Sequence, residues 1–310
     1  MKYNKVFFVL YLFLISIKTF SSDRSLYVDN FNSILGDEFK EEQLLSFAKE
    51  NNFKTLILYE LHKVNKRISL KDTTKNYILA NFIASAKRDY GILNISASGE
   101  SGGFFINIIH VYNTSRTKSD EKFDIYNLEY EYWKISGSDL GGYYCENYLR
   151  KNGIPCTRNG SFKYYIESLS IMKLLASDSE HPIKVESYVG NYKKKEIRKI
   201  VKNADKILIS GFAADIKNSF LNVKKMLEIV CDCSCNAKVS IILSAEIEYM
   251  GGYLKYQSLE LAEKSFLKEL KEYDSKMAET LNLIDFTYFN YSYLQKSVNF
   301  ETFRRTGIKK

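Results

Sequence analysis

The sequence has 310 residues, of which 45% are hydrophobic and 26% charged, as in a folded globular protein with one large domain or two small ones. The formal charge of +8 comes from 45 basic and 37 acidic residues with no arginine-rich stripe, so nucleic acid is not an expected partner. Aromatic residues make up 15%, which suits carbohydrate-stacking surfaces and also suits a plain β-rich core.

The amino-terminal segment has the pattern of a secretory signal peptide. Lys2 and Lys5 precede the apolar run VFFVLYLFLISI, and the small-residue segment KTFSS follows it. The run is shorter than the ~20 residues that a transmembrane helix needs. The sequence therefore predicts cleavage after Ser21 and a secreted or periplasmic protein of residues 22–310, with no stable membrane span. An uncleaved anchor is the alternative.

The rest of the chain alternates short apolar runs with helix-patterned segments. The runs are SLYVDNF from Ser25, KTLILYEL from Lys54, GILNISAS from Gly91, FDIYNLEYEYW from Phe123, IKVESYV from Ile183, KILISGFAAD from Lys206, KVSIILSAEIEYM from Lys238 and LIDFTYFNYSYL from Leu283.

Helical patterns lie between several of these runs. They cover residues 41–52, 73–89, 161–177, 193–204, 218–232 and 258–281. Strand-like runs that alternate with helices in this number and length predict a single-domain (β/α)₈ barrel, an α/β fold. A doubly wound open sheet is the alternative, although no G-x-G-x-x-G turn follows any strand to favour a dinucleotide-binding form.

The fourth run carries polar residues at alternate positions. If Leu128, Tyr130 and Tyr132 face the helices, then Asn127, Glu129 and Glu131 face the barrel interior. Glu131 would lie at the carboxyl end of the strand, where such barrels place their chemistry. Two carboxylates this close repel each other, so one is expected to hold a proton near neutral pH, as a general acid requires.

The segment Asp124–Glu131, DIYNLEYE, resembles the D-x-x-D-x-D-x-E strand of family 18 glycoside hydrolases, the chitinases and endo-β-N-acetylglucosaminidases. The resemblance implies a (β/α)₈ barrel with this motif on its fourth strand, Glu131 as the acid that protonates the glycosidic oxygen, and Glu129 as the residue that orients the attacking 2-acetamido group of the substrate. Asn127 and Glu129 replace two aspartates of the motif. The serine- and glycine-rich segment 94–104 is a weaker likeness to the third strand of that family.

Further candidates for substrate binding lie at other predicted strand ends. Trp133, the only tryptophan, could stack on a sugar ring or belong to the core. The remaining candidates are Glu186 and Tyr188 on the fifth run, Glu246 on the seventh, and Tyr288 and Asn290 on the eighth. Each could instead be structural. Together they would give an acidic, tyrosine-rich mouth suited to polyhydroxylated ligands.

The cysteines and histidines do not indicate a metal or another cofactor. Cys145 and Cys156 flank a short polar loop and are predicted to form a disulfide, which an exported protein can keep. The CDCSC cluster (Cys231, Cys233, Cys235) lacks the C-x-x-C spacing of a zinc knuckle, so a loop disulfide with a spare thiol is preferred to a metal. The three histidines form no H-x-H pair, which disfavours a metal-dependent phosphodiesterase.

Two functions fit these features. The first is an exported glycoside hydrolase that acts on N-acetylglucosamine-containing glycans, with Glu131 as acid and Glu129 as orienting carboxylate. The second is a barrel of the same lineage that binds a glycan without cutting it, as the changes at Asn127 and Glu129 suggest.

Overall fold

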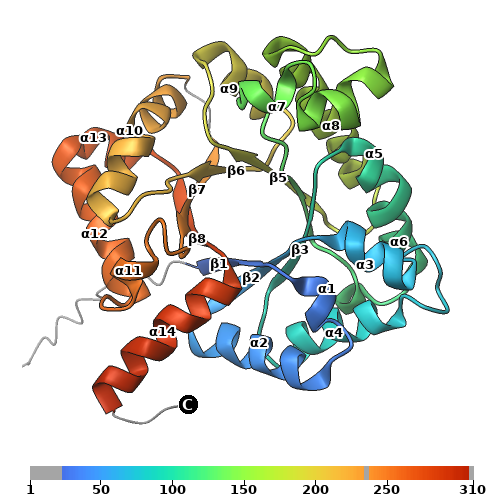
Figure 1. Ribbon diagram of the computed structural model, residues 1–310, viewed down its shortest axis with the longest axis horizontal. Helices are drawn as coiled ribbons and strands as arrows, with labels where there is room; N and C mark the ends of the chain where they lie inside the picture. The colour runs from blue at the N-terminus through green and yellow to red at the C-terminus, as the bar shows by residue number, and fades with distance from the viewer. Residues whose placement is uncertain (1–22, 234–236, 307–310) are drawn as a thin grey trace, which may run out of the picture.

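The computed structural model describes residues 23–233 and 237–306, which form one barrel domain (Figure 1). Parallel strands close in the order β1-β2-β3-β4-β5-β6-β7-β8. They are β1 (Asp23–Val28), β2 (Phe53–Leu58), β3 (Asn94–Gly99), β4 (Ile125–Leu128), β5 (Lys184–Val189), β6 (Lys206–Ser210), β7 (Lys238–Ser244) and β8 (Leu283–Phe289). The predicted (β/α)₈ fold is confirmed. The proposed signal peptide and its cleavage position lie outside the described residues.

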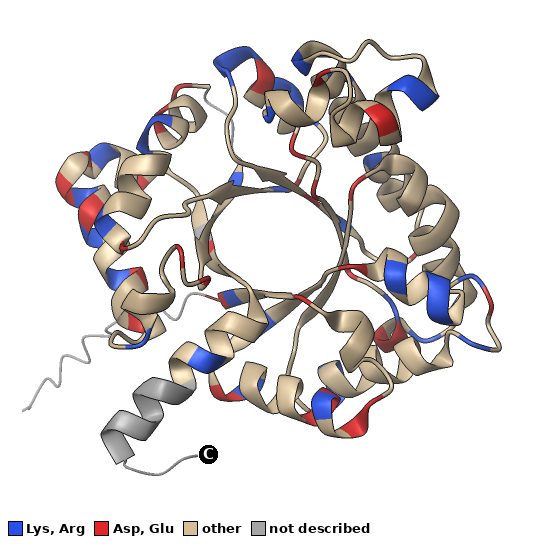
Figure 2. Cartoon of the chain, in the orientation of Figure 1, with Lys and Arg blue, Asp and Glu red and all other residues tan. Residues whose placement is uncertain are grey.

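Helices surround the strands on every side (Figure 1). They are α1 (Phe31–Ile34), α2 (Glu38–Glu50), α3 (Leu61–Ile68), α4 (Tyr77–Arg88), α5 (Gly102–Phe104), α6 (His110–Ser115), α7 (Ile135–Ser138), α8 (Arg158–Ser177), α9 (Lys194–Ile200), α10 (Ile216–Asp232), α11 (Gly251–Leu254), α12 (Leu259–Tyr273), α13 (Ser275–Thr280) and α14 (Tyr291–Thr306). Basic and acidic residues are interspersed around this outer layer (Figure 2).

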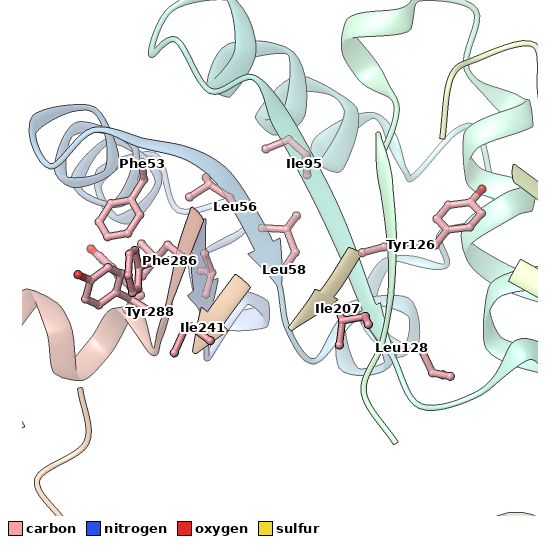
Figure 3. Close-up of a cluster of buried hydrophobic side chains, with 14 of the residues drawn as sticks. Phe53, Leu56, Leu58, Ile95, Tyr126, Leu128, Ile207, Ile241, Phe286 and Tyr288 are labelled. Carbon is pink, nitrogen blue, oxygen red and sulfur yellow. The ribbon is translucent and has the colours of Figure 1, made fainter. Parts of the chain in front are cut away.

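The alternation of side chains along each strand divides the buried residues into two cores. The larger core lies between strands and helices and includes Leu56, Ile95, Tyr126 and Phe286 (Figure 3). The smaller one lies inside the barrel and consists of the side chains Tyr27, Ile57, Tyr188, Leu208 and Ile242. Because the interior is filled by side chains, the barrel has a packed floor rather than a pore.

Several predicted runs extend past the ends of their strands, because strand-like sequence continues past the end of the ladder, and the fourth and eighth runs are examples. The residue pattern predicts that the fourth run stays extended to Trp133, but β4 ends at Leu128, and the amide of Glu129 makes a further bond to the carbonyl of Gly99 (2.9 Å). It also predicts that the eighth run reaches Leu294, but α14 begins at Tyr291. In both places the strand residues lead directly into the loops and helices of one barrel face.

The connection between β3 and β4 contains a helical segment that the residue pattern does not predict. Helix α5 continues through a π-helical turn, Phe105–Ile109, into α6. The hydroxyl of Ser101 caps its first turn by accepting from the amide of Phe104 (3.1 Å). The glycines at its start, which suggest a loop, allow α5 to approach α8 closely. A Cβ on Gly102 would lie 3.0 Å from the Cα of Ser168.

This contact gives a prediction about stability. Gly102→Ala should lower the free energy of unfolding by about 1–3 kcal/mol, since the added methyl group overpacks the α5–α8 contact. Gly103→Ala is the matched control, because a Cβ there would meet only the hydroxyl of Ser101 at 3.9 Å. It should be neutral or stabilise by up to about 1 kcal/mol. Urea denaturation of both variants measures the difference, and equal stabilities would contradict the packing argument.

Candidate active site at the barrel mouth

A cavity of about 410 Å³ opens where β2 and β3 end, at the carboxyl-terminal face of the barrel. It is lined by Tyr59, Glu60, His62, Ser98, Gly99, Glu100, Ser101, Phe104, Tyr143 and Tyr148. Barrels of this kind place their chemistry at this face, because the loops that follow all the strands converge there. The β4 residue next to Ser98 in the sheet is Asn127, and Glu129 follows two positions later.

Glu129 lies deep in this mouth and is partly accessible from it. The hydroxyl of Ser98 donates to its Oε2 at 3.0 Å. Burial raises the pKa of Glu129 to about 8, the negative charges of Glu131 and Glu100 contribute to the rise, and the Ser98 hydrogen bond opposes it. Glu129 is therefore a carboxyl that keeps its proton near neutral pH.

Glu131 lies nearer to solvent, with a side chain 21% exposed, and is surrounded by donors. Lys134 approaches its Oε2 at 2.6 Å. The phenols of Tyr144 and Tyr188 lie 3.5 and 3.4 Å from its carboxylate oxygens. Of the pair, Glu129 is the carboxyl that fits the expectation of a proton held near neutral pH.

A third carboxylate, Glu100, forms the outer wall of the cavity. It directly follows β3 and accepts hydrogen bonds from the phenols of Tyr143 (2.8 Å) and Tyr148. Tyr59 lies among these acids, and its pKa is raised by the charge of Glu129 first and by burial second. This side of the mouth is therefore rich in acceptors and phenols.

The disulfide Cys145–Cys156, with its Cα atoms 5.1 Å apart, closes the loop that carries these tyrosines. Tyr144 packs on Tyr130 with ring centroids 4.3 Å apart, and its hydroxyl accepts from the amide of Glu131 (3.2 Å). The loop between β4 and α8 thus forms one wall of the cavity beside the carboxylates.

The opposite side of the mouth is aromatic. Phe212, which follows β6, stacks on Phe289 at the end of β8 (5.7 Å) and packs on Tyr249 after β7 (5.2 Å). Tyr27 joins the two sides, since it contacts Phe289 (5.4 Å) and Tyr59 (6.5 Å) edge to face. An acidic wall opposite an aromatic one is an arrangement that sugar rings can use, with hydroxyl groups on one side and stacking on the other.

Trp133 is half-buried between these walls. Its ring packs edge to face on Tyr188 (5.3 Å) and contacts the core inside the barrel. It lies over the backbone where β5 ends, so a Cβ on Gly190 would come within 2.6 Å of the indole ring. Trp133 and Tyr188 thus lie near Glu131, as the alternation along the strands suggests.

Other residues predicted for the site lie elsewhere. Glu186 is buried inside the barrel, below the mouth, where it pairs with Lys206 (2.7 Å). Tyr288 points out of the barrel into the outer core, beside Phe53 and Phe286 (Figure 3). Its hydroxyl donates to Glu263 (3.0 Å). Asn290 is buried after β8, and its side-chain oxygen accepts from the amide of Tyr293.

The last two predicted residues are nearer to the mouth. Asn127 is fully buried beneath it and contacts Tyr27 and Glu186. Glu246 is half-buried in the loop after β7, where its carboxylate accepts from the hydroxyl of Ser244 (3.0 Å).

Asp124, the first residue of the motif, lies at the amino-terminal end of β4. Its carboxylate pairs with Lys87 (2.7 Å), lies 3.1 Å from His181 and accepts from the amide of Ile95 (2.8 Å). It therefore ties β4 to β3 at the end of the barrel opposite to the mouth.

The residue pattern misses Glu100, Tyr59 and Phe212. Glu100 could be found from the sequence, because it closely follows the third apolar run. Tyr143 and Tyr148 could not, since only the path of the loop brings them to Glu100.

Cys231 and Cys233 of the CDCSC cluster lie apart from the mouth, at the end of α10. Cys231 carries a free thiol, Cys233 is disulfide-bonded, and Cys235 lies outside the described residues. Within residues 23–233 and 237–306, no group of His, Cys, Asp and Glu is arranged to hold a metal ion. In the same part of the chain, no helix is both long and apolar enough to cross a membrane.

No protein-family model matches the sequence, and no curated protein is significantly similar to it. Among solved structures, a glycoside hydrolase family 17 β-1,3-glucanosyltransferase from Rhizomucor miehei is 14% identical, with a TM-score of 0.47 over 86% of this chain and 85% of that chain. A 2,3-dimethylmalate lyase of the PEP mutase/isocitrate lyase superfamily is 11% identical, with a TM-score of 0.43 over 93% and 83%. An oxaloacetate acetylhydrolase is 10% identical, with a TM-score of 0.46 over 93% and 83%.

The raised pKa of Glu129 predicts a pH-dependent cost to stability. The unfolded chain loses this proton near the ordinary glutamate pKa of 4.5 and the folded protein near 8, so stability falls as pH rises between these values. Glu129→Gln, which stays neutral, should be about 1–3 kcal/mol more stable than wild type at pH 8.5 and gain little at pH 4, a figure reduced because the side chain is partly exposed. Denaturation at both pH values measures the gain. Glu248→Gln, at an exposed position, controls for charge, and an equal gain at both pH values would contradict the argument.

The single tryptophan gives a second prediction. Gly190→Ala should displace the indole of Trp133 and change its fluorescence emission, because the new methyl group would overlap the ring. Gly252→Ala is the control, since nothing lies within 4 Å of its added Cβ. Identical spectra for wild type and Gly190→Ala, with the fold intact by circular dichroism, would show that Trp133 does not pack on Gly190.

Proposed function

We propose that this protein is an exported glycoside hydrolase that cleaves N-acetylglucosamine-containing glycans at the barrel mouth. The observation that carries the proposal is the pair Glu129 and Glu131 after β4, of which one favours its protonated form near neutral pH and the other is accessible and surrounded by phenols. General acid catalysis of glycosidic cleavage needs a carboxyl that holds its proton at working pH.

In the proposed reaction the pair shares one proton. Glu131, the more accessible carboxyl, gives that proton to the glycosidic oxygen as the bond to the anomeric carbon breaks. The oxygen of the substrate's acetamido group bonds to that carbon, while Glu129 accepts from the acetamido N–H. Water then bonds to the same carbon and gives one proton to Glu131, and the bond from the carbon to the acetamido oxygen breaks. Because Lys134 lies 2.6 Å from Oε2 of Glu131, the bound sugar must displace this ammonium and allow the proton to move from Glu129 to Glu131.

Two observations support export and a sugar ligand. The Cys145–Cys156 disulfide suits an oxidising compartment. The aromatic surface of Phe212, Tyr249 and Phe289 offers a stacking platform opposite the carboxylates.

A glycan-binding barrel without catalysis is the second candidate. It is favoured by the 2.6 Å ion pair between Lys134 and Glu131, which occupies an oxygen of the residue that would act as acid. It is also favoured by Glu129, whose side chain is one methylene longer than the aspartate of the resembling motif.

Product release distinguishes the two. Wild type, Glu131→Gln and Glu129→Gln are incubated with chitooligosaccharides and with an N-glycosylated protein, and the products are identified by mass spectrometry. We expect cleavage by wild type and a loss of at least about 100-fold in each variant, with Glu248→Gln as the active control. Binding, followed by Trp133 fluorescence, without turnover in any form would favour the binding barrel. Neither binding nor turnover by wild type would refute both.

A further inference from the structure

Below the mouth, a chain of buried polar side chains follows the inside of the barrel. Lys206 on β6 contacts Glu186 on β5 (2.7 Å) and Asp285 on β8 (2.9 Å). The amide nitrogen of Asn127 donates to the other oxygen of Glu186 (3.2 Å), and the hydroxyl of Tyr27 donates to the amide oxygen of Asn127 (3.3 Å). Each of these side chains belongs to a residue less than 10% exposed.

The ion pairs of Lys206 determine whether Glu186 donates or accepts hydrogen bonds. Burial alone would lower the pKa of Lys206, but the charges of Glu186 and Asp285 outweigh it and raise that pKa above its usual range. Lys206 is therefore an ammonium group, and Glu186 faces it as a carboxylate. A carboxylate only accepts hydrogen bonds.

Because Glu186 only accepts, the orientations of Asn127 and Tyr27 are also fixed. Asn127 must direct its NH₂ group at Glu186, so its carbonyl oxygen faces Tyr27. The tyrosine hydroxyl has a single proton, and it donates that proton in its hydrogen bond to the amide oxygen of Asn127. Tyr27 is thus left with only lone pairs for any group above it.

The group above Tyr27 belongs to the mouth. Its ring lies in the interior core with Tyr188, which contacts Glu131, and it packs edge to face on Tyr59 in the cavity wall. The hydroxyl of Tyr27 contacts Asn127, which precedes Glu129 by two positions and faces the same side of the barrel, so this hydroxyl lies below Glu129. Burial first, and then the charge of Glu129, raises the pKa of Tyr27, so this phenol stays protonated.

We propose that Glu186 and Lys206 are positioning residues that act through Asn127 to hold the Tyr27 hydroxyl as a hydrogen-bond acceptor toward the mouth. An acceptor oxygen at this position favours a protonated Glu129. In a bound sugar it favours a hydroxyl or amide N–H, which can donate, over an ether oxygen, which cannot. The preference for a sugar group rests on the proposed function. The effect on Glu129 does not, and it can be tested without turnover.

The first test is the titration of Glu129 in the full chain, followed by NMR of ¹³C-carboxyl-labelled glutamate in wild type and Tyr27→Phe. The titratable groups that surround Glu129 in both proteins are Glu100, Glu131, Lys134, Tyr59, Tyr144 and Tyr188. If Tyr27 accepts, its removal withdraws a partner from the protonated carboxyl, and the midpoint should fall by about half to one pH unit. A rise would mean that Tyr27 donates, and no change would mean that it does not contact Glu129. Either result would overturn the proposal.

The second test concerns Glu186. Glu186→Gln and Asp285→Asn each remove one negative charge from Lys206, but only the first changes the partner of Asn127. A glutamine can donate as well as accept, so Asn127 can turn and free the Tyr27 hydroxyl to donate to Glu129. We expect the midpoint to fall by about one pH unit more in Glu186→Gln than in Asp285→Asn, and this difference should vanish when Tyr27→Phe is added.

Equal Glu129 titration midpoints in Glu186→Gln and Asp285→Asn would mean that Glu186 acts only through its charge, and this would overturn its positioning role. Breaking a buried ion pair can prevent folding, in which case Tyr27→Phe, which leaves every ion pair intact, still decides the direction of the hydroxyl. Absence of glycan cleavage by wild type in the earlier assay, with these titration shifts present, would reject the proposed reaction and keep the polarity of the floor.

Discussion

The mouth depends on the two-residue alternation of side chains where β4 leaves a closed barrel. Closure gives the sheet an inside and an outside, so successive residues after Leu128 cannot both be placed among the helices. Tyr130 and Tyr132 are fully buried in the outer core, which leaves Glu129 and Glu131 on the side of the mouth. The burial of these two rings stabilises the segment by several kcal/mol, and this packing holds two carboxylates close together despite their repulsion.

The two carboxylates meet different surroundings although they are two residues apart. Glu129 accepts a hydrogen bond from a serine hydroxyl and lies where water is scarce. Glu131 is at the opening and has an ammonium group and two phenols as neighbours. Depth in the mouth therefore gives the two acids different partners, and the deeper one keeps its proton near neutral pH.

The fold, and the placement of Glu129 and Glu131 at the mouth, could be predicted from the sequence, because both depend on local periodicity. Eight apolar runs with helices between them indicate the barrel, and the alternation from Asn127 to Tyr132 separates the polar residues from the buried tyrosines. Depth along the axis could not be predicted in this way. Glu186 and Tyr188 share one strand face, yet Glu186 lies in the ion-pair layer and Tyr188 beside Glu131, because β5 is paired with β4 so that Glu186 is level with Asn127. Tyr288 is misplaced for a simpler reason, since it lies one position out of phase with the inward residues of β8.

Contacts between residues far apart in the sequence could not be predicted either. Phe212, Tyr249 and Phe289 come from three separate loops or strand ends, and nothing local marks them as one surface. The tyrosines of the β4–α8 loop gain their role only through the fold of that loop onto Glu100 and Glu131.

The disulfide in this loop has a consequence for the proposed export. The barrel floor is held by strands and ion pairs that form in any compartment, whereas the wall bearing Tyr143, Tyr144 and Tyr148 is tethered by a covalent bond that a reducing cytosol does not keep. A chain that folds before it is oxidised therefore has its carboxylates in place but an untethered wall. Oxidation of two thiols is then the last step in the assembly of the mouth, and the compartment in which the protein arrives decides when that step occurs.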